Sequence, residues 1–261
     1  MIQQVRTLFR YRLLIESLVS RELKARYRGS VLGFFWSFVN PLLMLLVYVM
    51  VFTVILPGRH LPAMEPYALF LFCGILPWSW LSASLLESSG VVIAGGNLIK
   101  KVLFPAEILP VVTVLTNLVQ FLLGLPVLFG FLAAYGKLRP TALLLPLPIL
   151  VQLVFTLGLA LFVSALTVHF RDVQSLLGHL VHLWFFASPV LYLYGVQEGW
   201  LRAFLRLNPM AHVLVSYQEM LFDGRFDHGP QLATTALVAL VVFAGGAWFF
   251  DRLRDTLAEE V

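Results

Sequence analysis

The stretch "RELKARYRGSVLGFFWSFVNPLLMLL", residues 21–46, changes character halfway along its length. Its first third carries four cations: Arg21, Lys24, Arg26 and Arg28. An apolar run that contains an Asn40-Pro41 pair follows them. Cations placed against one end of an apolar segment of about 20 residues are typical of a membrane-spanning helix held at the cytoplasmic face. The stretch therefore predicts an integral membrane protein.

The whole chain has the composition that this prediction requires. Of its 261 residues, 60% are hydrophobic and only 12% are charged, whereas soluble domains carry about 25% charged residues. The single cysteine, Cys73, excludes a disulfide framework. The first apolar run begins near residue 31, which is too late for a removable signal peptide. The net charge of +4 comes from cations beside apolar runs, so we expect them to set topology and expect no nucleic-acid partner.

Apolar runs of spanning length occur at six places: about 31–56, 67–86, 108–135, 141–168, 173–194 and 231–250. Backbone groups inside lipid must be hydrogen-bonded internally, so each run predicts a helix. The expected fold class is an all-α integral membrane protein with six transmembrane helices in one domain, residues 29–261. Twelve of the 18 lysines and arginines fall on the side that holds both termini, which places both termini in the cytoplasm.

The N-terminal tail, residues 1–28, has the pattern of an amphipathic helix. At 100° per residue its cations gather within an arc of about 60°: Arg6, Arg10, Arg21, Lys24 and Arg28. Apolar side chains occupy the opposite face: Leu8, Tyr11, Ile15, Leu18 and Val19. This predicts a cytoplasmic interface helix with its apolar face in the lipid boundary. Arg12 and Arg26 break the pattern, so we expect the helix to end near residue 25.

The second cytoplasmic loop, "ESSGVVIAGGNLIKKVLFPAE" at 87–107, contains a short helix signal. Three glycines are expected to interrupt the preceding helix: Gly90, Gly95 and Gly96. Asn97 can cap a new helix, and Pro105 ends it. Lys100 and Lys101 would face water beside apolar contact residues such as Phe104. This arrangement suits docking to a cytoplasmic protein, and the alternative is a basic loop that serves topology alone.

The outer segment 195–230 also contains a helix signal. Asn208 caps it, Pro209 takes its first position and Asp223-Gly224 stops it. The pattern gives an apolar stripe (Met210, Val213, Leu214, Tyr217, Met220 and Leu221) and a polar stripe (His212, Ser216 and Glu219). About 14 residues are too few to cross the bilayer, so we expect a re-entrant helix buried by protein or lining a polar cavity at the exit of a pathway.

Three features of the sequence bear on the kind of transport. His179 and His182 lie three residues apart in the fifth run. They could bind a metal ion as a pair, or they could be neutral histidines that face a polar interior. Further metal ligands are not evident, so we expect no metal site. Several phenylalanines either belong to interfacial aromatic belts or line a pore against sugar rings: Phe34, Phe35, Phe38, Phe185 and Phe186. The sequence has no G-x-x-x-x-G-K-[ST] loop, so another chain must supply the energy for uphill transport.

Four motifs together resemble one known family. They are "RYRGSVLGFFWSFVNPLLMLLVY" at 26–48, "NLIKKVLFPAEILP" at 97–110, "HFRDV" at 169–173 and "LNPMAHVLVSYQEML" at 207–221. In this order they look like the membrane subunit of type-2 ABC exporters for polysaccharides, the transporters of O-antigen, capsule and teichoic acid. The resemblance covers essentially the whole chain.

The resemblance implies a homodimer of six-span subunits in the bacterial inner membrane, with two ATP-binding-cassette subunits below it. ATP and Mg would be bound by those subunits, with no cofactor and no enzymatic activity in this chain. Lipid-linked polysaccharide would pass between the two copies, through a channel lined by their first and fifth spans. The loop with Asn97, Lys100, Lys101 and Phe104 resembles the coupling helix. Arg21, Lys24 and Arg28 resemble the interface helix, where the lipid head would be admitted.

The Asn40-Pro41 pair fits a helix that bends beside a hydrophilic conduit, because Pro41 frees a carbonyl and Asn40 adds a polar group; a tolerated kink in an ordinary span is the alternative. Two other transport classes fit the sequence less well. A type-2 permease for a drug or small lipid commonly carries a large outer domain, whereas the first outer loop here, about 57–66, is short. Ion-coupled transport is disfavoured because the spans hold few ionisable residues.

Overall fold

The computed structural model describes residues 9–55, 62–96, 105–195 and 198–260, and the regular elements in these ranges are all helical. Five of the described segments are long and apolar enough to cross a membrane: Gly33–Met50, Tyr67–Ala94, Ile108–Ala134, Pro140–His169 and Gly229–Leu253. The all-α fold class is therefore confirmed. The count of six spans stays a prediction.

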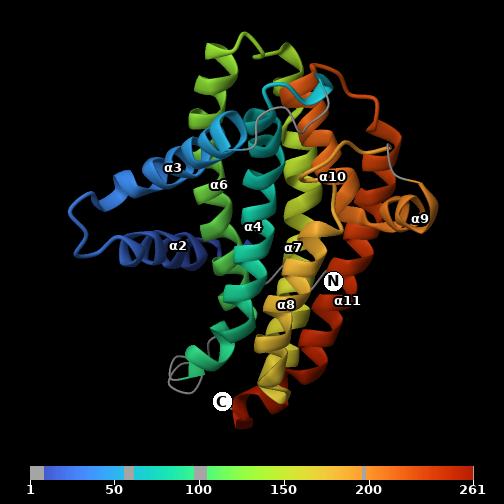
Figure 1. Ribbon diagram of the computed structural model, residues 1–261. Coiled ribbons are helices and arrows are strands. Elements are labelled where there is room, and N and C mark those ends of the chain that lie inside the picture. The colour runs from blue at the N-terminus through green and yellow to red at the C-terminus, as the bar shows by residue number, and fades with distance from the viewer. Residues whose placement is uncertain (1–8, 56–61, 97–104, 196–197, 261) are drawn as a thin grey trace.

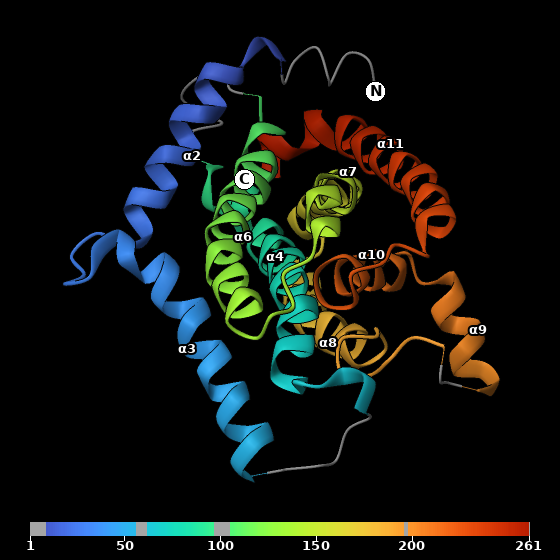
Figure 2. The same ribbon diagram turned by 90° about the horizontal axis from the view of Figure 1, so that it is seen from above.

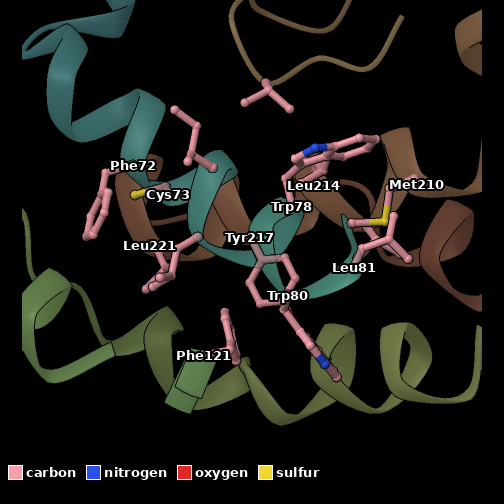
Figure 3. Packing of buried hydrophobic residues seen from close by; sticks show 14 of the residues in the cluster. Phe72, Cys73, Trp78, Trp80, Leu81, Phe121, Met210, Leu214, Tyr217 and Leu221 are labelled. Carbon is pink, nitrogen blue, oxygen red and sulfur yellow. The ribbon is translucent and has the colours of Figure 1, made fainter. Parts of the chain in front are cut away.

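Helix α4 (Tyr67–Ala94) runs through the middle of the bundle (Figures 1 and 2). It contacts five helices: α3 (Trp36–Met50), α6 (Ile108–Ala134), α7 (Pro146–His169), α8 (Asp172–Phe186) and α10 (Pro209–Gln218). Figure 3 shows the core that these helices share. The ring of Phe121 stacks on Trp80 at 5.2 Å between centroids and meets Tyr217 edge-on at 5.9 Å. These large buried rings fix α4, α6 and α10 together.

The last helix, α11 (Gly229–Glu260), packs along α7 on the side of the bundle away from α2 and α3 (Figure 2). A five-residue 3-10 turn, Pro140–Leu144, leads into α7. The short helix α9 (Gly199–Leu207) projects from the periphery beside α8 and α10. At about 1.5 Å per residue, the 32 residues of α11 measure about 48 Å, which exceeds the hydrocarbon thickness of about 30 Å.

Helices α2 (Arg12–Arg26) and α3 (Trp36–Met50) form an arm beside the bundle. Figure 1 shows α2 lying across the bundle axis and α3 rising obliquely from the turn between them. We call this turn, residues 27–35, the elbow; a 3-10 turn at Gly33–Phe35 leads into α3, and a π-helical turn at Val51–Ile55 follows it. Only 11% of the Gly33–Met50 segment is buried, against 78% for Tyr67–Ala94. Most of α3 is therefore uncovered by the bundle.

The apolar face of α2 packs on protein, contrary to the expectation that it lies in lipid. Ile15 and Leu18 are buried against the first turns of α6, where they meet Ile108, Val111 and Val112. The residues of the apolar stripe were read correctly, but a stripe does not say whether lipid or another helix covers it. The helix ends at Arg26, one residue beyond the expected end.

Helix α4 is longer than expected at its C-terminal end. We expected Gly90 to interrupt it, yet the helix continues from Glu87 to Ala94 and gives way to a turn only at Gly95. A single glycine weakens a helix by about 1 kcal/mol without breaking it. Gly90 also serves close packing, because an added Cβ would lie 3.2 Å from the side-chain amide nitrogen of Gln174 on α8.

Helix α8 is shorter than the apolar run that predicts it. It ends at Phe186, whereas the run extends to residue 194. Residues 187–190 form turns, and Pro189 has no N–H with which to continue the helix. The 15 residues of α8 span about 22 Å, less than the thickness of the hydrocarbon core.

Candidate functional site

The cations assigned to the interface helix are exposed. Arg21 and Lys24 lie on α2, and Arg28 lies in the turn that follows it. All three side chains avoid the face that Ile15 and Leu18 bury against α6. They are therefore available to phosphate groups of lipids at the membrane surface.

Arg26 behaves differently from these three cations. Its guanidinium reaches the bundle, where it is in contact with the carboxylate of Glu87 on α4 and donates to Asn117 Oδ1 on α6 at 3.1 Å. Asn117 Nδ2 in turn donates to the same Glu87 oxygen at 2.8 Å. The sequence signal was present, because Arg26 breaks the basic stripe of α2 and Glu87 ends the apolar run of α4. Its meaning as a three-helix contact was missed.

A small cavity of about 200 Å³ lies behind the elbow, between α3 on one side and α4 and α6 on the other. Asn40 and Pro41 line it, together with Trp36, Ser79 and Gln120. The elbow itself is held by two hydrogen bonds: Trp36 Nε1 donates to Ser30 Oγ at 2.7 Å, and Gln120 Nε2 donates to Tyr27 Oη at 3.1 Å. The Asn40-Pro41 pair therefore faces a partly polar space, and α3 continues through Pro41 as a helix.

The aromatic candidates for a channel lie on two separate helices. Phe34 and Phe35, at the start of α3, are 52% and 69% exposed, and Phe38 packs edge-on against Phe34. On α8, Phe186 is 53% exposed and contacts Phe185, whose ring packs against Trp78 of α4. Within one subunit these rings therefore form two exposed patches.

The histidines of α8 point away from the bundle, contrary to the expectation that they face a polar interior. His179 and His182 are both exposed, and the His182 ring meets Phe186 at 5.4 Å. Leu176, Leu180 and Leu183 share this exposed face of the helix. Among the described residues there is no group of three or more potential metal ligands.

The expected re-entrant helix is α10, and its start is built as the sequence predicts. Asn208 Oδ1 accepts from Met210 N at 3.1 Å, and Pro209 takes the first position. A π-helical turn, Glu219–Asp223, extends α10, and Gly224 stops it with φ of +75°. Both stripes of the helix are buried, so the candidates His212, Ser216, Tyr217 and Glu219 are packed inside the subunit.

Glu219 anchors the loop that joins α10 to α11. Its carboxylate accepts from the backbone N–H groups of Asp227 and His228 at 2.9 and 3.0 Å, and it contacts the His228 ring through Nδ1. Burial raises the pKa of Glu219, but the hydrogen bonds and charge of His228 and the bond from Asp227 outweigh it. The pKa of this carboxyl is therefore lowered overall, and the group is held ionised.

The candidates of the coupling loop lie outside the described residues: Asn97, Lys100, Lys101 and Phe104. The two helices that flank this loop are described. Helix α4 enters it at Ala94 and α6 leaves it at Ile108. Both helix ends lie at the lower end of the molecule in Figure 1, near the C-terminal end of α11.

Fold and site together define a multi-pass helical membrane protein that has a cationic interface helix and lacks a nucleotide-binding motif of its own. Residues 14–222 match the ABC-2 type transporter family, and the chain belongs to this family. The match runs from the first turn of α2 through α10, and α11 lies beyond it.

Three relatives share most of the length of the chain. The O-antigen export system permease protein RfbA of Myxococcus xanthus is 42% identical over 100% of both chains. The protein of the same name from Klebsiella pneumoniae is 30% identical over 94% of both chains. The polysialic acid transport protein KpsM of Escherichia coli is 25% identical over 91% of this chain and 93% of its own.

Proposed function

We propose that this chain is the membrane subunit of an ATP-driven exporter that moves lipid-linked polysaccharide, of the O-antigen or capsule type, across the bacterial cytoplasmic membrane. The observation that carries the proposal is the full-length similarity to a permease for O-antigen export. The four sequence motifs lie in or beside the arm, the loop between α4 and α6, the turn between α7 and α8, and helix α10.

The working assembly in this proposal contains two copies of the chain and two ATP-binding subunits. Closure of the ATP-binding subunits moves the loop between α4 and α6, and the seam between the two copies opens. The exposed faces of α3 and α8 supply apolar and aromatic surface for this seam, because only 11% of the α3 segment is buried and Phe186 remains open. Both termini lie in the cytoplasm.

The cations of the interface helix have a separate role in this mechanism. Arg21, Lys24 and Arg28 attract the phosphate head of the lipid carrier at the inner leaflet. The exposed rings of Phe34 and Phe35 lie close to these cations in the chain and offer apolar faces to sugar rings.

Export of a drug or small lipid by a related permease is the second candidate. The short outer loop and the relatives for O-antigen and polysialic acid favour the polysaccharide.

Deletion of the gene tests the proposal. We expect lipid-linked polysaccharide to accumulate inside the cell and to disappear from the surface, and a plasmid copy should restore both. Normal surface polysaccharide together with increased drug sensitivity would favour the second candidate instead.

A further inference from the structure

The contact of Arg26 with Glu87 and Asn117 joins three elements that sequence distance separates. Arg26 closes α2, Glu87 lies on α4, and Asn117 lies on α6. Asn117 is 3% exposed, and its Nδ2 donates hydrogen bonds to the Glu87 carboxylate and to the backbone oxygen of Thr113. We call these three residues the arm clamp. The clamp fastens the lower end of the arm to the bundle.

The two bundle helices in the clamp are those that flank the cytoplasmic loop. Glu87 precedes the end of α4 by seven residues, and Asn117 follows the start of α6 by nine. At 1.5 Å per residue these separations are about 11 and about 14 Å along each helix. A shift at the cytoplasmic ends of α4 and α6 therefore reaches the clamp through short, continuous helices, which are stiff connections.

The other side of the clamp leads into α3. Arg26 is followed at once by Tyr27, which bonds Gln120 on α6, and the Trp36–Ser30 bond closes the elbow on itself. The elbow thus follows Arg26 directly in the chain, and the Trp36–Ser30 bond joins it to the first turn of α3. Displacement of Arg26 would carry the start of α3 with it.

Helix α3 also has room to move. The cavity of about 200 Å³ separates it from α4 and α6 just above the elbow. Closely packed interiors resist displacement, whereas a partly empty contact lets one helix tilt without repacking its neighbours. The first turns of α3 therefore depend on the clamp for their position, while its later turns pack on the bundle through Leu45.

Arg26 is also unlike the cations that would attract the lipid carrier. Its charge is compensated by Glu87, whereas Arg21, Lys24 and Arg28 are exposed. A cation held by a carboxylate and an amide is a weak phosphate ligand, because binding phosphate would cost both contacts. This argues for a mechanical role.

We propose that the arm clamp, Arg26 with Glu87 and Asn117, transmits movement from the cytoplasmic ends of α4 and α6 to the elbow and α3. This inference rests on the proposed function, since it concerns how ATP-driven movement reaches the seam. Arg26, Glu87 and Asn117 act as positioning residues.

The test uses the assembled exporter in proteoliposomes, with ATP hydrolysis and glycan export measured on the same sample. Glu87→Gln, Arg26→Gln and the charge reversals Arg26→Glu and Glu87→Arg are compared with wild type. Coupling changes along a transmission path are worth about 0.5–2 kcal/mol, so export per ATP should fall by roughly two- to thirtyfold. ATP hydrolysis and co-purification with the ATP-binding subunit should be nearly unchanged, which a merely structural role would not produce. The double reversal Arg26→Glu with Glu87→Arg should restore part of the lost export per ATP.

Glu22→Gln is the matched control, because Glu22 is an exposed carboxylate on α2 itself. If the Gln variants assemble and export as much glycan per ATP hydrolysed as wild type, the clamp has no coupling role, although the proposed function stands. If wild-type complexes with active ATP-binding subunits export no glycan, the proposed function itself fails. If charge reversal prevents folding, the amount of glycan exported per ATP by the neutral Gln variants still shows whether the clamp has a coupling role.

Discussion

Gly246 on α11 lies directly against the backbone of Gly158 on α7. A Cβ added to Gly246 would overlap the carbonyl oxygen of Gly158, and a Cβ added to Gly158 would lie 2.6 Å from the backbone of Phe243. Small residues let membrane helices approach this closely, and the close approach increases dispersion contact along both helices. The pair thus explains how α11 packs along the length of α7.

The first prediction concerns this contact. Gly246→Ala should destabilise the subunit by about 1–3 kcal/mol, because the added methyl group overpacks a backbone contact. Thermal unfolding of the purified subunit in detergent measures the effect. The adjacent Gly245→Ala is a matched control: an added Cβ there meets no atom within 4 Å, so the change should be neutral or stabilising by up to about 1 kcal/mol. Equal effects of the two variants would contradict the packing argument.

The second prediction concerns Asn208, which joins α8 to α10. Its Oδ1 accepts from Trp184 Nε1 at 3.0 Å in addition to capping α10, and its Nδ2 donates to Ala187 O and Ser188 Oγ. Asn208→Ala should cost about 3 kcal/mol, because the partly buried indole N–H of Trp184 and the cap both lose their acceptor.

Asn208→Asp separates the two halves of this side chain. It keeps an acceptor for Trp184 and for the cap but loses both donated bonds, so its loss of stability should be intermediate. Asn40→Ala, at an exposed position, should change the unfolding midpoint little. An Asn208→Ala variant as stable as Asn40→Ala would show that the network contributes nothing.

The third prediction concerns pH and Glu219. Because the folded pKa of Glu219 is lowered below its ordinary value of 4.5, its contribution to stability is present above about pH 4.5 and is lost as pH falls through the folded pKa. Glu219→Gln should unfold more easily at pH 7, by about 1–3 kcal/mol, and its loss of stability below pH 4.5 should be smaller than that of wild type.

Unfolding midpoints measured between pH 3 and pH 7 test this prediction, and Glu198→Gln, at an exposed position, is the control. Parallel pH curves for wild type and Glu219→Gln would mean that Glu219 does not anchor the loop.

The fourth prediction concerns the cytoplasmic loop. Replacing Lys100 and Lys101 by Glu reverses two charges on the surface that we expect to dock the ATP-binding subunit. Co-purification of that subunit should fall, and export should fall with it. The single reversal Arg252→Glu, at an exposed position near the C-terminal end of α11, should leave both unchanged. An intact complex with normal export in the Lys100 and Lys101 variant would refute the assignment.

The sequence predicted most of the helices, because apolar runs and caps are local properties of the chain. Asn208, Pro209 and Gly224 mark the ends of α10 and its extension correctly. What could not be predicted was the partner of each face. The stripe of α2 did not distinguish lipid from α6, and the apolar run after Phe186 did not reveal that Pro189 ends α8 early.

In the candidate site too, local patterns could be predicted from the sequence and tertiary contacts could not. The basic face of α2 was predictable from periodicity, and Arg26 was visible as an exception to it. Its contact with Glu87 and Asn117 depends on tertiary packing across 61 and 91 residues of sequence. His212, Ser216 and Glu219 are buried within the subunit, because neighbouring helices cover both stripes of α10, and their assignment to an exit stays a prediction. Asn40 lies at a small cavity between α3, α4 and α6, and its position beside a hydrophilic conduit stays a prediction.

The most direct test of the central claim is transport by purified components. Proteoliposomes should hold this chain with or without its ATP-binding subunit, with lipid-linked polysaccharide in the accessible leaflet, and appearance of glycan on the opposite side is measured. We predict movement only when both subunits and hydrolysable ATP are present, and none with this chain alone under any ion gradient. Gradient-driven movement by the isolated chain would contradict the account.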